Sequence, residues 1–127
     1  MVELKSETNQ NLKNQMEIWK QIQNFEKYSI SSFGNLKATN NRGREYLISI
    51  TNNGNDYQRA YLYKNGKRTK FFIHRLVALA FIPNTDPTKN QVHHIDHVRN
   101  NNGKTNLMWC TSKENNQYKI DFHKGNS

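Results

Sequence analysis

Two adjacent histidines, His93 and His94, are the residues of this 127-residue chain best suited to chemistry. Imidazole titrates close to neutral pH, so it can take a proton from water, and it is also a common metal ligand. An asparagine-rich loop of 11 residues, 96–106, follows the histidines, and Asn115 lies a little further on. Imidazole and amide side chains together can activate water beside a bound cation.

The elements that must position these residues follow one another as strand, loop, strand and helix. Residues 91–95 and 107–110 predict two short strands. Thr111 and Glu114 then match the T-x-x-E capping box that opens a helix, which places Asn115 in its first turn. Neighbouring residues of an ideal strand face opposite ways, so the paired histidines can serve one site only if the strand ends there. We expect it to end there.

Short motifs with fixed spacing run along most of the chain, in this order: Glu17-Ile18-Trp19-Lys20, Phe25-Glu26-x-Tyr28-x-Ile30-Ser31-x-x-Gly34, His74-Arg75-Leu76-Val77-Ala78-x-Ala80-Phe81-Ile82-Pro83, His93-His94-Ile95-Asp96, Asn100-Asn101-Asn102, Asn106-Leu107-x-Trp109-x-Thr111 and Glu114-Asn115. Together they resemble the HNH endonucleases, in the homing-endonuclease-like branch. The resemblance extends over residues 17–119. It implies an α+β protein in which a small antiparallel β-sheet module precedes a ββα-metal (His-Me finger) core.

The resemblance also implies a role for each polar residue. His93 would bind one divalent metal ion together with Asn115, and His94 would be the general base that deprotonates the attacking water. Asn106 would hold the loop and the base in place. Two protein ligands leave most of the coordination shell to water and phosphate oxygens, which suits Mg²⁺. Mn²⁺, Zn²⁺ and Ni²⁺ stay open, since imidazole suits Zn²⁺ and Ni²⁺ better.

One position departs from the family pattern. The loop often begins Asp-Gly-Asn in the family, whereas here it begins Asp96-His97-Val98. His97 could be a second base, a phosphate contact or a residue without a role, and we favour the last. His74 and His123 are also expected to be structural, because an isolated histidine more often packs or lies on the surface than takes part in a site.

The distribution of charge points to a partner. The chain carries 19 Lys and Arg against 10 Asp and Glu, a formal net charge of +9. Residues 37–75 alone hold nine basic and two acidic side chains, which accounts for +7 of that charge. Concentrated positive charge on a small domain is typical of proteins that bind nucleic acid. We expect double-stranded DNA as the partner, and a solvated basic surface is the alternative.

A hairpin in this basic segment is the candidate DNA-binding surface. Asn65-Gly66 between two alternating runs predicts a two-residue type I′ turn. In that register Ala60 and Leu62 share one face, which we expect to cover the core. A two-stranded ribbon fits the major groove, although Tyr and Lys pairs also stabilise ordinary sheets. The opposite face carries the candidate DNA-binding residues Arg59, Tyr61, Tyr63, Arg68 and Lys70.

We expect three parts along the chain. Residues 1–16 would be a flexible arm, residues 17–73 a β-rich DNA-binding module, and residues 74–127 a connecting helix and the HNH nuclease core. Only 12 residues follow Asn115, so we expect a short and loosely discriminated target sequence.

Other classes of protein fit the composition less well. The longest apolar run, residues 76–82, is too short to span a membrane, and no signal-peptide pattern follows Met1. The single cysteine, Cys110, excludes an internal disulfide and a cysteine zinc site. We expect an intracellular protein, cytoplasmic or encoded by a phage or an intron, that acts as a monomer or a homodimer.

Two alternatives to an enzyme remain. One is a non-catalytic DNA- or RNA-binding module with a degenerate nuclease site, and the other is a small structural protein of a ribonucleoprotein. A decayed site would not need to keep His93, His94, Asn106 and Asn115 together. We therefore expect an HNH endonuclease that nicks one DNA strand per active site.

Overall fold

The computed structural model describes residues 15–51 and 56–125, so the expected N-terminal arm lies almost entirely outside the described residues. The elements follow in the order β1 (Trp19–Ile22), β2 (Phe25–Ser31), β3 (Leu36–Thr39), β4 (Glu45–Leu47), β5 (Arg59–Lys64), β6 (Lys67–Phe72), α2 (Ile73–Phe81), β7 (Gln91–His94), η1 (Lys104–Asn106), β8 (Leu107–Cys110) and α3 (Ser112–Gly125).

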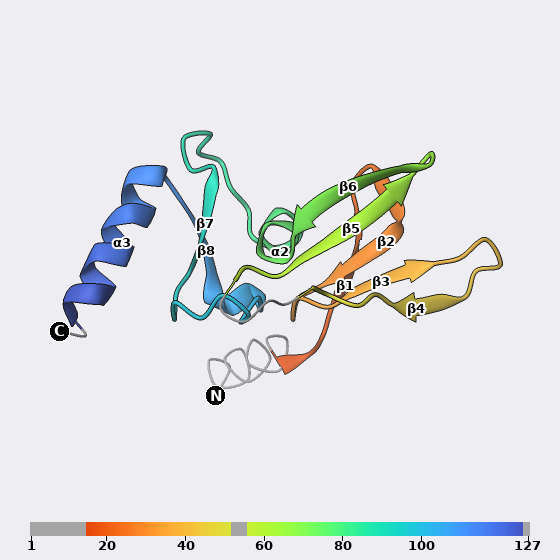
Figure 1. Ribbon diagram of the computed structural model, residues 1–127, viewed down its shortest axis with the longest axis horizontal. Coiled ribbons are helices and arrows are strands. Elements are labelled where there is room, and N and C mark those ends of the chain that lie inside the picture. The colour runs from red at the N-terminus through yellow and green to blue at the C-terminus, as the bar shows by residue number, and fades with distance from the viewer. Residues whose placement is uncertain (1–14, 52–55, 126–127) are drawn as a thin grey trace, which may run out of the picture.

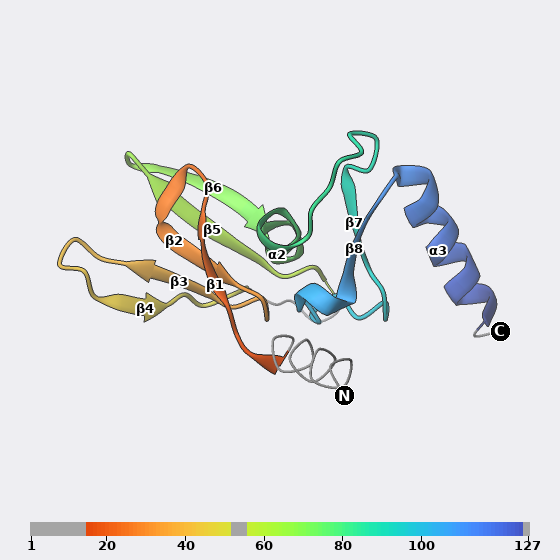
Figure 2. The same ribbon diagram turned by 180° about the vertical axis from the view of Figure 1, so that it is seen from behind.

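In the part of the chain that the structure describes, the strands form three antiparallel sheets. Strands β1 to β4 pair in sequence order, whereas β5 pairs with β6 and β7 with β8. Figure 1 shows α2 end-on between the first six strands and the β7–β8 hairpin, and α3 on the far side of that hairpin, as does the view from behind in Figure 2. This confirms the expected α+β class. Within residues 15–51 and 56–125, every helix falls short of the length and apolarity of a membrane crossing.

The hairpin of β5 and β6 has the predicted register. Tyr61 pairs with Lys70 and Lys64 with Lys67, which leaves Asn65-Gly66 as the turn. Both turn residues have positive φ, 53° and 76°, as a type I′ turn requires. Ala60 and Leu62 are 2% and 0% exposed, so the apolar face covers the core as expected.

Helix α2 holds the two halves of the chain together through one continuous core. Its residues Leu76 and Val77 are buried in a cluster that also contains Leu62 from β5 and Leu107 from β8. The helix begins at Ile73 and ends at Phe81, shortly before Pro83. Proline cannot continue a helix because it lacks the backbone N–H. The core is therefore shared by the strands that precede α2 and the hairpin that follows it.

The last helix begins at the predicted capping box. Thr111 N donates to Glu114 Oε1 at 2.9 Å, and Glu114 N donates to Thr111 Oγ1 at 3.0 Å. This reciprocal pair satisfies two backbone N–H donors at the helix start with side-chain acceptors. It places Asn115 in the first turn of α3, facing the β7–β8 hairpin.

The turn between β2 and β3 touches the asparagine-rich loop. Gly34 has φ +89°, and a Cβ added there would lie 2.9 Å from Asn102 Cβ. Lys104 N donates to Ser32 O at 2.8 Å. A side chain at position 34 would therefore push on the loop, in addition to the strain of its own backbone.

Candidate active site

The two histidines lie at the end of β7 and take different neighbours. The His93 ring lies 4.6 Å from the Tyr118 ring of α3, between centroids, whereas the His94 ring lies 5.0 Å from that of His74 in α2. The strand ends at His94, as expected, and His97 N donates to His94 O in the turn that follows. Both histidines line one cavity of about 140 Å³, so the alternating strand geometry still brings them to a common site.

The ring orientation of His94 is fixed by a buried asparagine. His94 Nε2 lies 2.7 Å from Asn102 Oδ1, and Asn102 Nδ2 donates to Gln58 Oε1, also at 2.7 Å. Asn102 is only 3% exposed. Because its amide nitrogen is already the donor to Gln58, its oxygen must accept from His94 Nε2–H. Neutral His94 therefore carries its proton on Nε2 and its lone pair on Nδ1.

The surroundings keep His94 uncharged near neutral pH. Burial lowers the pKa of His94 below its ordinary value, and the hydrogen bond that His94 donates to Asn102 opposes that effect in part. An unprotonated imidazole is the form that can accept a proton. Of the two ring nitrogens of His94, Nδ1 is therefore the one that can accept a proton.

His74 and Tyr57 line up next to His94. The ring centroids of Tyr57 and His74 are 5.0 Å apart in a stacked arrangement, and Tyr57 also stacks with His94 at 5.8 Å. Burial lowers the pKa of His74 to about 3. Among the buried side-chain nitrogen and oxygen atoms that the structure describes, His74 Nδ1 alone has no hydrogen-bond partner. His74 is thus a neutral ring packed against the base.

His93 and Asn115 form the candidate metal ligands. Asn115 Nδ2 donates to Gln91 Oε1 at 2.9 Å, which leaves Asn115 Oδ1 as the atom of this amide that can bind an ion. Burial, with His97 nearby, lowers the pKa of His93, which favours the neutral ligand form. Within residues 15–51 and 56–125, no three His, Cys, Asp or Glu side chains are arranged so that together they could hold one metal ion. One imidazole and one amide oxygen fit an ion that takes most ligands from water and phosphate.

Asn106 holds the loop rather than the ring of His94. Its Nδ2 donates to Asp96 Oδ1 and to Asn101 O, both at 2.9 Å, and its Oδ1 accepts from Asp96 N at 3.1 Å. The expected contact with the base is made instead by Asn102, four residues earlier. The sequence assigned two tasks to Asn106, holding the loop and holding His94. In the structure Asn106 holds the loop and Asn102 contacts His94.

Several residues that the sequence did not single out also line the cavity. Arg99 stacks over the Tyr57 ring at 4.6 Å, and Lys119 comes from α3. His97, expected to have no role, lines the cavity as well. Arg99 could have been suspected from the sequence, because it lies in the loop that directly follows the histidines. No local sequence pattern marks Gln58 or Tyr57 as part of the site.

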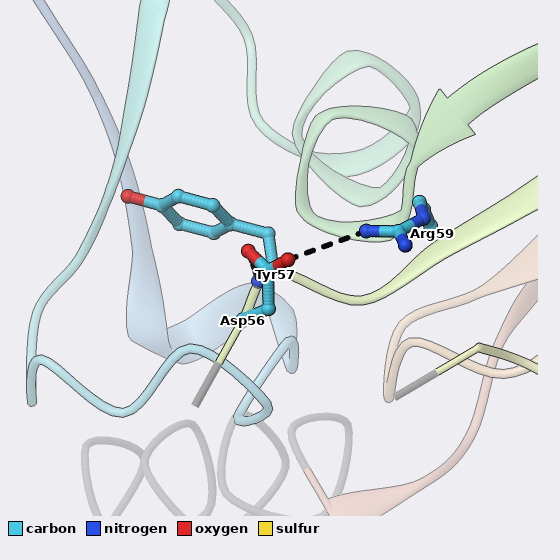
Figure 3. A network of polar contacts seen from close by, with 3 residues as sticks. All are labelled: Asp56, Tyr57 and Arg59. Atoms are coloured by element: carbon cyan, nitrogen blue, oxygen red, sulfur yellow. Dashed lines mark hydrogen bonds and ion pairs between the residues drawn. The ribbon is translucent and has the colours of Figure 1, made fainter. Parts of the chain in front are cut away.

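The candidate DNA-binding face begins next to this cavity. Figure 3 shows that the Tyr57 ring points away from Arg59 and toward the β7–β8 hairpin, while Arg59 pairs with Asp56 at 3.3 Å. Further along the hairpin, Arg68 lies 4.4 Å above the Tyr61 ring. Tyr63 and Lys70 are exposed on the same face. Basic and aromatic side chains therefore share this face of the hairpin, and Tyr57, just before β5, lines the cavity with the two histidines.

Comparison with known proteins places these features in a class. Residues 71–117 match the family model described as HNH endonuclease, and residues 17–63 match the NUMOD4 motif. His93, His94 and Asn115 thus lie within the match to the HNH endonuclease model. The chain thus carries an HNH endonuclease domain preceded by a NUMOD4 motif, which confirms the resemblance seen in the sequence.

Named relatives support the assignment. An uncharacterized HNH endonuclease of Acanthamoeba polyphaga mimivirus is 39% identical over 117 residues, which is 90% of this chain and 29% of the relative. The DNA endonuclease I-HmuI of Bacillus phage SP01 is 36% identical over 98 residues, 76% of this chain and 54% of that protein. A solved structure on DNA binding and cleavage by the HNH homing endonuclease I-HmuI matches with a TM-score of 0.73 and 31% identity. It covers 84% of this chain and 59% of that chain. The chain spans between about a third and three fifths of these relatives.

Proposed function

We propose that this chain is a metal-dependent endonuclease that hydrolyses a phosphodiester bond in double-stranded DNA. The observation that carries the proposal is the tautomer of His94, which leaves Nδ1 as the accepting nitrogen of a ring that lines one cavity with His93 and Asn115. The similarity to I-HmuI, whose structure is described as showing DNA binding and cleavage, supports DNA as the substrate.

His94 would act as the general base. Its Nδ1 accepts a proton from water while the water oxygen forms a bond to phosphorus, and the bond from phosphorus to the leaving sugar oxygen breaks. Asn102 and Gln58 keep the Nε2 side of the ring occupied, so the ring does not turn to present a protonated nitrogen to the water. The His94 ring also packs against His74 of α2 and against Tyr57, which lies just before β5.

His93 and Asn115 would hold one divalent ion, for which the sequence favours Mg²⁺. When bound, the ion supplies positive charge to the phosphate and to the leaving oxygen. Gln91 Oε1 accepts a hydrogen bond from Asn115 Nδ2. This contact fixes the amide group of Asn115 so that its Oδ1 points away from Gln91. Asn106 holds the loop that carries Asp96 and thereby the turn after His94.

DNA would approach along the outer face of β5 and β6. The residues proposed to contact it are Arg59, Tyr61, Tyr63, Arg68 and Lys70 in the module 17–73. Arg99 and Lys119, which line the cavity in the part 74–127, are suited to the phosphates next to the cut. Because one chain holds one His94, a monomer would nick one strand, and a break of both strands would need a dimer or two events.

The test uses supercoiled plasmid with the untagged full chain and Mg²⁺, Mn²⁺ or EDTA. We expect conversion to open circles in the presence of metal, none in EDTA, and none with His94→Ala. His123→Ala is the matched control, because it removes another imidazole of the cavity to which no role is assigned, and it should nick like wild type.

Two results would contradict the proposal. Nicking by His94→Ala at the wild-type rate would exclude His94 as the general base. Tight DNA binding by the wild type without cleavage in any of the metals would favour the non-catalytic binding module instead.

A further inference from the structure

His97 lies in an unusual backbone conformation beside the candidate metal ligands. Its φ is +61°, which L side chains rarely adopt, and its backbone N–H donates to His94 O at 3.0 Å in the turn that ends β7. The sequence pattern of the family favours glycine at this place, which has no such strain. This chain nevertheless carries an imidazole here, and that imidazole lines the same cavity as His93 and Asn115.

The two rings have the spacing of imidazoles that share one ion. The centroids of His93 and His97 are 4.8 Å apart and their planes meet at 76°. Two imidazoles that bind one ion through nitrogens at about 2.1 Å, at tetrahedral or octahedral angles, have centroids roughly 4.6–5.3 Å apart. The observed pair falls inside that range.

Helix α3 holds both rings from one face. Tyr118 lies against His93, and Phe122, one turn later, stacks on His97 at 4.1 Å and 17°. Asn115 lies one turn before Tyr118 on the same face of the helix. Phe122 covers one flat side of the His97 ring. This stacking does not use the ring nitrogens, which bind ions in the plane of the ring.

We propose that His97 is a third protein ligand of the divalent ion, next to His93 and Asn115. The inference rests on the proposed function, which assigns the other two ligands. Two imidazoles and one amide oxygen favour ions such as Ni²⁺ and Co²⁺, whereas Mg²⁺ prefers oxygen ligands. The substitution of an imidazole for the family's glycine would therefore shift the metal preference of this site without changing its base.

The first experiment is calorimetric titration of the untagged chain, without DNA, with Ni²⁺ or Mg²⁺. His97→Gly is the test variant, because glycine accepts the positive φ without strain and the fold is preserved. We expect its Ni²⁺ affinity to fall at least about tenfold and its Mg²⁺ affinity to stay within about twofold. His123→Ala, which removes a cavity imidazole with no ring contact to His93, should bind Ni²⁺ like wild type.

A second readout counts the ring ligands directly. In the Co²⁺ complex, proton NMR should show two strongly shifted exchangeable imidazole N–H signals in wild type and one in His97→Gly. Equal Ni²⁺ affinity in wild type and His97→Gly, or an unchanged number of shifted signals, would overturn the inference and leave His97 as a packing residue.

The same titration separates this inference from the proposed function. If His93→Ala loses Ni²⁺ binding and His97→Gly does not, only the role of His97 is overturned. If neither variant changes Ni²⁺ binding, the metal assignment of the proposed function is overturned as well. Nicking by wild type and its loss in His94→Ala are measured independently with plasmid DNA.

Discussion

Asn102 donates a hydrogen bond of 2.7 Å to Gln58, a residue 44 positions earlier in the chain. Gln58 lies in the segment that matches the NUMOD4 motif, and Asn102 lies in the HNH endonuclease domain. The same Asn102 contacts His94, so the protonation pattern of the candidate base depends on a side chain from the preceding segment. The part proposed to bind DNA thus takes part in arranging the part proposed to cut it.

Replacement of Asn102 by alanine should slow nicking without weakening metal binding. A general base typically raises the reaction rate by about 10²–10⁴-fold. We expect loss of the correct His94 tautomer to lower the nicking rate by about 10- to 100-fold. Asn102 raises the pKa of His94, so its removal should also move the acid limb of the pH–rate profile to lower pH. Asn100→Ala, at an exposed loop position, is the control. An unchanged rate and pH profile in Asn102→Ala would rule out this positioning role.

Substitution of Gly34 by alanine should damage both stability and nicking. Its φ of +89° strains any Cβ-bearing residue by about 1–2 kcal/mol. The new methyl group would in addition press on Asn102, which holds the base. Gly43→Ala provides the comparison, because Gly43 has φ +79° and nothing within 4 Å of the added Cβ. Thermal unfolding should show a loss in both variants, whereas plasmid assays should show slower nicking only in Gly34→Ala.

Acid should destabilise the protein through His74. Burial lowers the pKa of His74 to about 3, against about 6.5 in the unfolded chain, so the unfolded state binds the proton more tightly. Stability is therefore complete above pH 6.5 and is lost as the pH falls from 6.5 toward 3. Between pH 7.5 and pH 5 the loss due to this one residue is about 2 kcal/mol.

Urea unfolding at several pH values measures that dependence. His74→Phe keeps a ring against Tyr57 and His94 but cannot titrate, so its free energy of unfolding should depend less on pH than that of wild type. Parallel pH curves for the two proteins would show that His74 is not buried in its neutral form.

Removal of charge from the hairpin face should weaken DNA binding in a salt-dependent way. Arg68→Ala and Lys70→Ala should each lower the slope of log affinity against log salt by about one unit if each contacts one phosphate. Lys27, a basic residue of β2 outside this hairpin, gives the matched control as Lys27→Ala. The check is fluorescence anisotropy with labelled duplex at several salt concentrations, and equal slopes in all four proteins would exclude this face.

Much of the fold follows from local sequence signals. The Asn65-Gly66 turn sets the register of β5 and β6 because few other residues adopt positive φ at two successive positions. Thr111 and Glu114 start α3 by a reciprocal hydrogen bond between residues three apart. Such signals depend only on neighbours in the chain, so a single sequence is enough to recognise them.

The arrangement inside the site was harder to predict, because it depends on contacts between distant residues. The loop holds several asparagines, and Asn102 is the one that Gly34 and Gln58 bury against His94. Nothing local to residues 96–106 distinguishes it from Asn106. His97 appeared to be a residue without a role for the same reason, since Phe122 lies 25 positions further on. The roles of all these residues stay predictions that the variants above can test.

The continuous core around α2 limits how such enzymes can be recombined. Leu62 and Leu107 meet in one apolar cluster, and Gly34 and Gln58 touch the loop that holds the base. A chimera that joins the first six strands of this chain to a foreign nuclease half would therefore create a mismatched interior and a loose base at the seam. Engineering of new target preference is better confined to the outer face of β5 and β6, which is the face proposed to contact DNA and which lies away from that shared core.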